Sequence, residues 1–158
     1  MRSFLTTVLL AALANAPALA QLPVETATDQ LALLASEDAA LTANKKLVFD
    51  FWRVVLQAHQ VDRAADYLAE SYIQHNPNVA TGRAAFVAFF RQFPPEPVKD
   101  TIDDLVGIVA ERDLVIVALR QERLDLENEG QTYTTTWFDM FRVANGKIVE
   151  HWDYGTKE

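Results

Sequence analysis

The sequence predicts an α+β domain in which a curved antiparallel sheet wraps, as a cone, around three N-terminal helices. In the first half of the 158-residue chain, apolar residues recur at helical spacing. In the second half, four runs rich in β-branched and aromatic residues show alternating polarity. Asn145-Gly146 separates the last two runs, and both residues tolerate the positive φ of a type I′ hairpin turn. Helices followed by such a meander are typical of a sheet covered on one face.

The first twenty residues are expected to form an export signal. Arg2 precedes an apolar run over residues 4–14, and Ala18-Leu19-Ala20 is the small-x-small pattern that signal peptidase reads. The run is too short for a membrane-spanning helix, which needs about 20 residues. We therefore expect cleavage after Ala20, a periplasmic or secreted protein, and no membrane association after cleavage.

Residues 21–43 are interpreted as a leader segment and residues 44–158 as one folded domain. Leu47, Phe51 and Val54 lie on one stripe of the first predicted helix. The predicted helices are residues 44–58, 62–70 and 82–93.

Helix ends are predicted from capping residues. Asp62 can begin the second helix because its carboxylate accepts from the unpaired N–H groups of the first turn. Thr81 is expected to cap the third helix, and Pro94-Pro95 to end it. The intervening segment, residues 71–79, suits a turn.

The alternation of the last two strands leaves open which face lines the cavity. One face carries Trp137, Asp139 and Phe141 with Val149, His151 and Asp153, and the other carries Phe138, Met140, Trp152 and Tyr154. The four predicted strands are residues 101–110, 114–124, 132–143 and 147–154.

Composition excludes several classes of function. The 22 acidic residues outnumber the 14 Lys and Arg, which gives a net charge of -8 and argues against a nucleic-acid partner. The absence of Cys excludes disulfides, thiol nucleophiles and Cys-ligated zinc. Chemistry must therefore come from Asp, Glu, His and Tyr in a shaped pocket.

Two segments resemble one known family. Residues 137–152, WFDMFRVANGKIVEHW, resemble the closing hairpin of SnoaL-like polyketide cyclases, within the nuclear transport factor 2-like superfamily. Residues 72–77, YIQHNP, with Gly82-Arg83 and the aromatic helix 86–93, resemble the region before and within their third helix. The resemblance covers about residues 44–155 and implies a SnoaL-like domain, although this fold hosts several chemistries and inert binding modules.

The resemblance implies that Asp139 is a cavity carboxyl that acts as an acid/base in the cyclases. It also implies that the face carrying Trp137, Asp139, His151 and Asp153 points inward. Flanking Trp and Phe residues would remove solvent from Asp139 and raise its pKa toward neutrality. The alternative is an Asp at a solvated strand edge.

The isomerases of the superfamily imply a different base. Asn76 stands at the position that we align with their catalytic base, and an amide cannot take a proton. His75 or His151 would then have to serve. The alternatives are that His75 packs on Pro77, or that His151 is paired with Asp153 or Glu150.

The predicted site follows from these arguments. The candidate catalytic residues are Asp139, His75 and His151. The candidate substrate-binding residues are Asn76, Trp137, Phe141, Asp153 and Tyr72. His75, His151 and Asp153 could form a two-histidine, one-carboxylate set, but this spacing is unspecific, so we predict no metal and no cofactor.

Two functions remain open from the sequence. The first is an exported, cofactor-free enzyme that abstracts a proton beside a carbonyl of a small apolar molecule, as in aldol closure, isomerisation or a lyase reaction. The second is a non-catalytic binding module that holds a small molecule or peptide in the same cavity. The family commonly pairs sheets back to back, so we also expect a homodimer through the outer sheet face.

Overall fold

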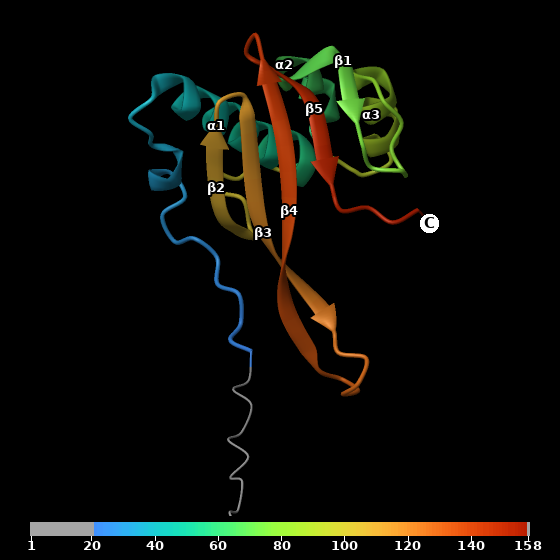
Figure 1. Ribbon diagram of the computed structural model, residues 1–158. Coiled ribbons are helices and arrows are strands. Elements are labelled where there is room, and N and C mark those ends of the chain that lie inside the picture. Colours follow the sequence, from blue (N-terminus) through green and yellow to red (C-terminus); the bar gives the residue numbers. More distant parts are fainter. Residues whose placement is uncertain (1–20, 158) are drawn as a thin grey trace, which may run out of the picture.

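The computed structural model describes residues 21–157 and confirms the α+β class (Figure 1). A five-stranded sheet has the order β1-β5-β4-β3-β2, and the helices pack against one of its faces. Its strands are β1 (Leu68–Gln74), β2 (Leu105–Glu111), β3 (Leu114–Leu124), β4 (Thr132–Ala144) and β5 (Lys147–Asp153). The predicted signal peptide lies outside the described residues. None of the helices within residues 21–157 is long and apolar enough to cross a membrane.

The first helix begins earlier than predicted. Asp38 accepts a hydrogen bond from the backbone N–H of Ala40 and thereby caps α1 (Ala39–Phe51). The helix continues as a π-helical segment, η2 (Trp52–Gln57), in which the turns are wider. A short 3-10 turn, η1 (Ala32–Leu34), precedes α1.

The segment after the first helix contains a strand that the sequence analysis missed. The predicted helix 62–70 is only a 3-10 turn, η3 (Val61–Arg63), followed by α2 (Ala64–Tyr67). From Leu68 the chain forms β1, which pairs in parallel with β5. This strand therefore places its residues beside the last strand of the chain.

The third helix, α3 (Arg83–Phe90), is also shorter than predicted. Thr81 does not cap it, because the hydroxyl of Thr81 accepts instead from the backbone N–H of Gln74. Gly82 precedes the helix with φ of 102°, a backbone conformation that favours glycine.

The four later strands form the predicted antiparallel meander. Asn145 and Gly146 both have positive φ, 51° and 69°, as the I′ hairpin requires. The β2 strand begins at Leu105 rather than at residue 101. The β3–β4 hairpin extends beyond the body of the domain as an arm (Figure 1).

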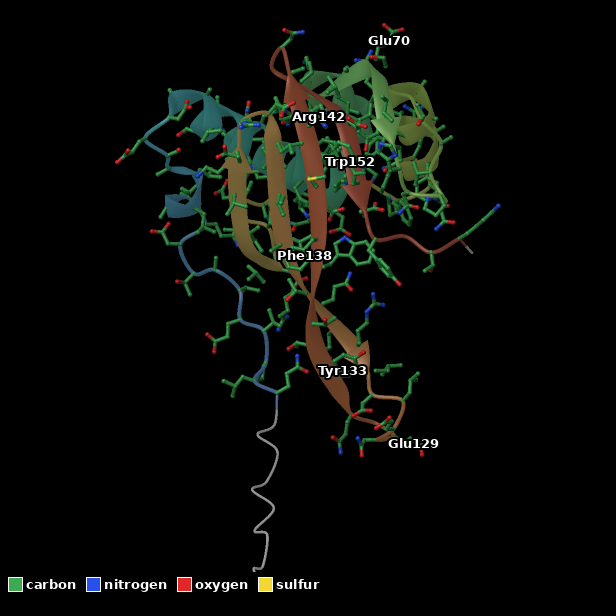
Figure 2. All side chains as sticks on the ribbon, in the orientation of Figure 1. Glu70, Glu129, Tyr133, Phe138, Arg142 and Trp152 are labelled. Carbon is green, nitrogen blue, oxygen red and sulfur yellow. The ribbon has the colours of Figure 1, made fainter. Side chains whose placement is uncertain are left out.

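The core lies between the helices and the concave face of the sheet. Phe51 stands at its centre, with ring centroids 6.1 Å from Tyr67, 5.8 Å from Phe86 and 5.9 Å from Phe141. The opposite face of the sheet leaves large side chains in solvent; Phe138 is 58% exposed and labelled in Figure 2.

Candidate functional site

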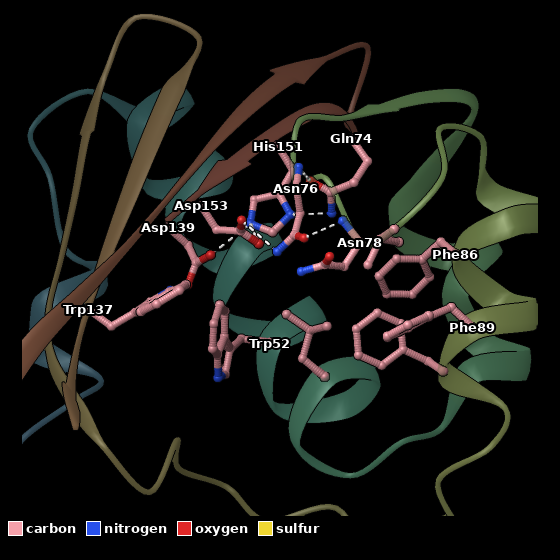
Figure 3. A pocket seen from close by; sticks show the side chains of 13 residues that line it. Trp52, Gln74, Asn76, Asn78, Phe86, Phe89, Trp137, Asp139, His151 and Asp153 are labelled. Carbon is pink, nitrogen blue, oxygen red and sulfur yellow. Dashed lines mark hydrogen bonds and ion pairs between the residues drawn. The ribbon is translucent and has the colours of Figure 1, made fainter. Parts of the chain in front are cut away.

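A cavity of about 390 Å³ opens between the concave face of the sheet and the helices (Figure 3). Its lining combines an apolar, largely aromatic set of side chains with a polar set of carboxylates, amides and an imidazole. The apolar set consists of Trp52, Leu56, Val79, Phe86, Phe89, Phe90 and Trp137. The polar set consists of Gln74, Asn76, Asn78, Asp139, His151 and Asp153.

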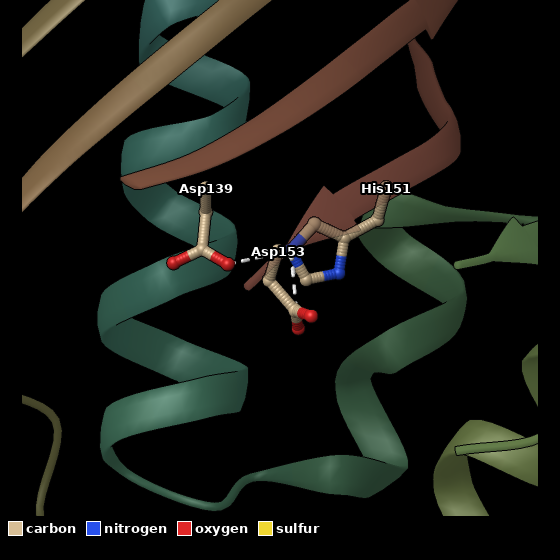
Figure 4. Close-up of side chains that lie close together, drawn as sticks. All are labelled: Asp139, His151 and Asp153. Atoms are coloured by element: carbon tan, nitrogen blue, oxygen red, sulfur yellow. Dashed lines mark hydrogen bonds and ion pairs between the residues drawn. The ribbon is translucent and has the colours of Figure 1, made fainter. Parts of the chain in front are cut away.

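The β4–β5 hairpin brings the two carboxylates and the imidazole together. Asp139 is the register partner of Asp153, and Phe141 is the partner of His151, so all four side chains lie on the concave face. His151 Nε2 is 2.8 Å from Asp139 Oδ1 and 4.0 Å from Asp153 Oδ2 (Figure 4). The inward face that the family resemblance implied is therefore confirmed.

A register shift between Arg142 and Val143 corrects one assignment on this face. Val149 was expected to point inward with His151. The irregularity instead pairs Val143 with Ile148, which is fully buried, while Val149 is only partly buried.

Asp139 is a buried acid, and one of its two carboxyl oxygens is itself buried without a hydrogen-bond partner among the described residues. The exposed fraction of Asp139 is 2%, and the oxygen without a partner is Oδ2. Burial raises the pKa of Asp139 above its ordinary value, because it disfavours the charge. The hydrogen bond and the charge of His151 oppose this shift, the charge of Asp153 reinforces it, and a weaker hydrogen-bond contribution from the Trp137 side chain opposes it. The Asp139 carboxyl therefore exchanges its proton at a higher pH than the carboxyl of an exposed Asp does.

Two predicted substrate-binding residues lie behind His151 rather than at the cavity. The Phe141 ring stacks on the imidazole at 4.3 Å between centroids, with an interplanar angle of 9°. The Tyr72 hydroxyl lies 2.9 Å from His151 Nδ1. The Phe141 and Tyr72 side chains are both fully buried. Phe141 and Tyr72 therefore hold the imidazole in place, and neither lines the pocket.

Asn76 and Asp153, two of the candidate substrate-binding residues, line the pocket and are hydrogen-bonded to each other. The Asn76 amide Nδ2 donates to Asp153 Oδ1 at 2.9 Å, and Asn76 Oδ1 accepts from the backbone N–H of Asn78. Gly155 packs closely here, because a Cβ built on it would lie 2.8 Å from Asn76 Nδ2.

Replacing Gly155 with Ala is expected to displace the Asn76 side chain, since that Cβ would overlap the amide. The side-chain NH₂ signals of Asn76 in a proton–nitrogen NMR spectrum should shift, while the fold is retained. Gly107→Ala is the matched control, because a Cβ at Gly107 meets nothing within 4 Å. Unchanged Asn76 signals in Gly155→Ala would contradict the packing described.

His75 lies on the other side of the sheet, away from the pocket. Its Nε2 is 2.8 Å from Glu150 Oε1, its ring stacks on Trp152 at 5.1 Å, and its side chain is 43% exposed. The hydrogen bond from His75, and to a lesser extent the one from Arg142, lowers the pKa of Glu150. His75 was a candidate catalytic residue because of the family resemblance, with the segment before it interpreted as a helix and a turn. This segment instead forms the strand β1, and His75 follows its last residue and lies on the face opposite to Gln74.

The structure adds pocket residues that the sequence analysis did not select. Trp52 and Leu56 come from the π-helical segment, and Gln74 comes from the missed strand. Phe86, Phe89 and Phe90 project from α3. Their i, i+3, i+4 spacing is a signal for one aromatic helix face, whereas nothing in the sequence pointed to Gln74.

Asp139, His151 and Asp153 also form a set that could hold a cation, with donor atoms within 4.8 Å of one another. The His151 nitrogen on the side of the two carboxylates, Nε2, is already hydrogen-bonded to Asp139 Oδ1. We therefore assign no metal to it.

Comparison with known proteins relates this fold to one family. Residues 48–151 match the family model of the SnoaL-like domain. A proposed polyketide cyclase from Acidithiobacillus ferrooxidans is 17% identical, with a TM-score of 0.54 over 76% of this chain and 90% of that one. A proposed SnoaL-like polyketide cyclase from Jannaschia sp. CCS1 is 20% identical, with a TM-score of 0.54 and the same coverage.

A third similar structure has a different activity in its name. The LEH-like epoxide hydrolase from M. tuberculosis is 15% identical, with a TM-score of 0.50 over 72% of this chain and 82% of that one. No curated protein matches the sequence significantly. Likeness at such identities establishes the fold and leaves the reaction to be argued from the site.

Proposed function

The chain belongs to the SnoaL-like domain family, and from this premise we propose that it is a cofactor-free acid/base enzyme acting beside a carbonyl group of a small apolar molecule. The observation that carries the proposal is Asp139, a buried carboxyl in an aromatic pocket with an unpartnered oxygen. A general acid/base needs a shifted pKa and a place beside the substrate, and Asp139 has a raised pKa and is one of the residues that line the pocket.

In the proposed reaction, ionised Asp139 removes a proton from the carbon beside the carbonyl. The C–H electron pair then delocalises onto the carbonyl oxygen as an enolate. In aldol closure, the enolate carbon bonds to a second carbonyl carbon, and the resulting alkoxide takes the proton back from Asp139. In isomerisation, another carbon of the same molecule takes it. Either route regenerates the carboxylate without a redox step.

The rest of the pocket supports this chemistry. The Asn76 amide lines the same pocket as Asp139, and the N–H that it does not donate to Asp153 can stabilise the enolate oxygen. Trp52, Phe89 and Trp137 bind the apolar body of the substrate. The described residues that line this pocket include no Lys or Arg, so we propose an uncharged substrate.

Hydrogen exchange tests this function without knowledge of the natural substrate. The protein is incubated in D₂O with a panel of cyclic and aromatic ketones, and deuterium uptake beside the carbonyl is measured by mass spectrometry. We expect uptake above background that Asp139→Asn abolishes. Native mass spectrometry of protein from its own host identifies retained small molecules to add to the panel. Tight binding of a retained ketone without exchange would contradict the proposal and favour the binding-module function.

We also propose that the protein forms a homodimer through the convex face of the sheet. Ile116, Met140 and Trp152 form one row across three strands, and Phe138, which is 58% exposed, extends this apolar surface. Tyr154, predicted on the same face, lies beyond the end of β5 and packs its ring against the inward-facing Trp137 instead. Light scattering should give twice the mass of one chain at micromolar concentration.

The dimer prediction has a matched pair of variants. Phe138→Lys should shift the mass to that of a monomer, because it places a charge in the apolar surface. Leu126→Lys, at an exposed position in the loop of the arm, should not change the mass. A wild-type monomer at micromolar concentration would contradict the prediction.

Finally, we propose that the enzyme acts in the periplasm or the medium after cleavage following Ala20. The intact mass of the exported protein should correspond to a chain that begins at Gln21. A soluble cytoplasmic protein that retains Met1 would contradict this proposal.

A further inference from the structure

The orientation of the Gln74 side-chain amide is fixed by the backbone. Its Oε1 accepts hydrogen bonds from the backbone N–H groups of His75, at 2.8 Å, and Asn76, at 3.0 Å. Backbone N–H groups can only donate, so the oxygen of the amide must face them. The NH₂ group of Gln74 is consequently held on the opposite side, toward the pocket wall.

That NH₂ group faces the inner nitrogen of His151. Gln74 Nε2 lies 3.0 Å from His151 Nδ1 and 3.1 Å from the Tyr72 hydroxyl oxygen. An amide NH₂ has no acceptor, so a hydrogen bond to Nδ1 requires that Nδ1 carries a lone pair rather than a proton. The Tyr72 hydroxyl accepts a hydrogen bond from Gln74 Nε2. It lies 2.9 Å from His151 Nδ1 and donates its own hydrogen to Nδ1. Burial raises the pKa of Tyr72, so this hydroxyl keeps its proton.

A neutral imidazole with an unprotonated Nδ1 carries its hydrogen on Nε2. Nε2 lies 2.8 Å from Asp139 Oδ1, and it therefore donates to that oxygen. Oδ1 is then an acceptor in both protonation states of Asp139. The second oxygen, Oδ2, is directed away from His151 (Figure 4). It is buried and has no hydrogen-bond partner within bonding distance among residues 21–157, although the Trp137 side chain is near enough to lower the pKa of the carboxyl slightly.

We infer that Gln74 is a positioning residue that fixes the tautomer of His151 and thereby confines the exchangeable proton of Asp139 to Oδ2. The link to proton exchange with a substrate rests on the proposed function, whereas the tautomer itself does not. The backbone of β1 and the loop after it thus determine which carboxyl oxygen works as the acid/base.

Nitrogen NMR of histidine-labelled protein tests the inference directly. Long-range proton–nitrogen correlations at mildly alkaline pH, where an ordinary His is neutral, distinguish the two tautomers. His59→Gln and His75→Gln variants assign the three histidines. In the wild type we expect an unprotonated Nδ1 in His151. A proton on Nδ1 would overturn the inference.

Three variants identify the residue that is responsible. Gln74→Glu keeps one oxygen for the backbone N–H groups and turns the other, an acceptor, toward Nδ1, so Nδ1 should become protonated. Gln74→Met removes the donor, and both tautomers should appear. Tyr72→Phe keeps the Gln74 donor and should retain the wild-type tautomer.

Several results would overturn the role of Gln74. A folded Gln74→Glu or Gln74→Met that keeps the wild-type tautomer would assign the control to Tyr72, as would a proton on Nδ1 in Tyr72→Phe. If Gln74→Glu does not fold, the Gln74→Met and Tyr72→Phe spectra decide. These spectra report the tautomer of His151 and do not depend on turnover. If the proposed enzyme activity fails, the spectra are therefore unchanged, and the failure is seen in the deuterium-exchange assay instead.

Discussion

Asp139→Asn is expected to lower turnover by roughly a hundredfold or more, the usual scale for loss of a general acid/base. The folded state should survive, because the Asn oxygen can still accept from His151 Nε2 and its NH₂ group replaces the protonated Oδ2. Turnover and the free energy of unfolding in urea are the two measurements. The melting temperature should stay unchanged or rise, since no buried charge remains to be formed.

The pH dependence of stability has a definite sign. The pKa of Asp139 is raised in the folded state, so the folded protein binds more protons than the unfolded chain between the ordinary pKa, about 3.9, and the raised one. The stability contributed by protonated Asp139 is complete below the unfolded pKa and is lost as the pH rises through the folded pKa. Asp139→Asn should remove this decline from the pH profile of the free energy of unfolding.

Two results distinguish this role from a structural one. Neither nearby arginine is paired with Asp139, because Arg142 bonds Asp113 and Glu150, and Arg120 bonds Asp104. A loss of about 1 to 3 kcal/mol in Asp139→Asn with unchanged ligand binding would therefore contradict the catalytic role. His75→Gln is the matched control, since His75 lies across the sheet, and its turnover should equal that of the wild type.

Phe141→Ala is expected to lower the free energy of unfolding by about 3 to 5 kcal/mol, the range for truncating a fully buried Phe. The Phe141 ring contacts Phe51 and Trp52 on the helix side and lies flat against His151. The substitution would leave a cavity at the centre of the core and remove the surface on which the imidazole stacks. Urea denaturation with a constant m-value measures the effect.

Tyr133→Ala is the matched control for this substitution. Tyr133 lies on the same strand but on the projecting arm, where it is about half exposed. Its truncation should change the free energy of unfolding by no more than about 0.5 kcal/mol. An effect of Phe141→Ala as small as that of Tyr133→Ala would show that Phe141 does not support the core.

The sheet was predictable where its order follows the sequence. Strands β2 to β5 are neighbours along the chain, and the Asn145-Gly146 turn fixes the last pair, so alternation sufficed to place Asp139 and His151 on one face. The strand β1 was not predictable in this way. Its segment, LAESYIQ, has a weak alternation, and its partner is about 77 residues away.

The site was predictable to the same extent. Asp139, His151, Asp153 and Trp137 come from the meander, and all four line the pocket. The errors concern Tyr72 on the missed strand and His75 directly after it, because without the pairing of β1 the side of the sheet on which each residue lies was unknown. Phe141 was misplaced for another reason: alternation gives the face, but it cannot separate the mouth of a cavity from the core beneath it.

The parallel pairing of β1 with β5 determines the order in which the site assembles during folding. Asp139 and His151 are 12 residues apart and meet through a hairpin, whereas Tyr72 and Gln74 are 79 and 77 residues from His151. Closing the longer loop costs more chain entropy, so contacts of β1 should form after the hairpin. We therefore expect the burial that raises the pKa of Asp139 to be complete only after β1 has paired with β5.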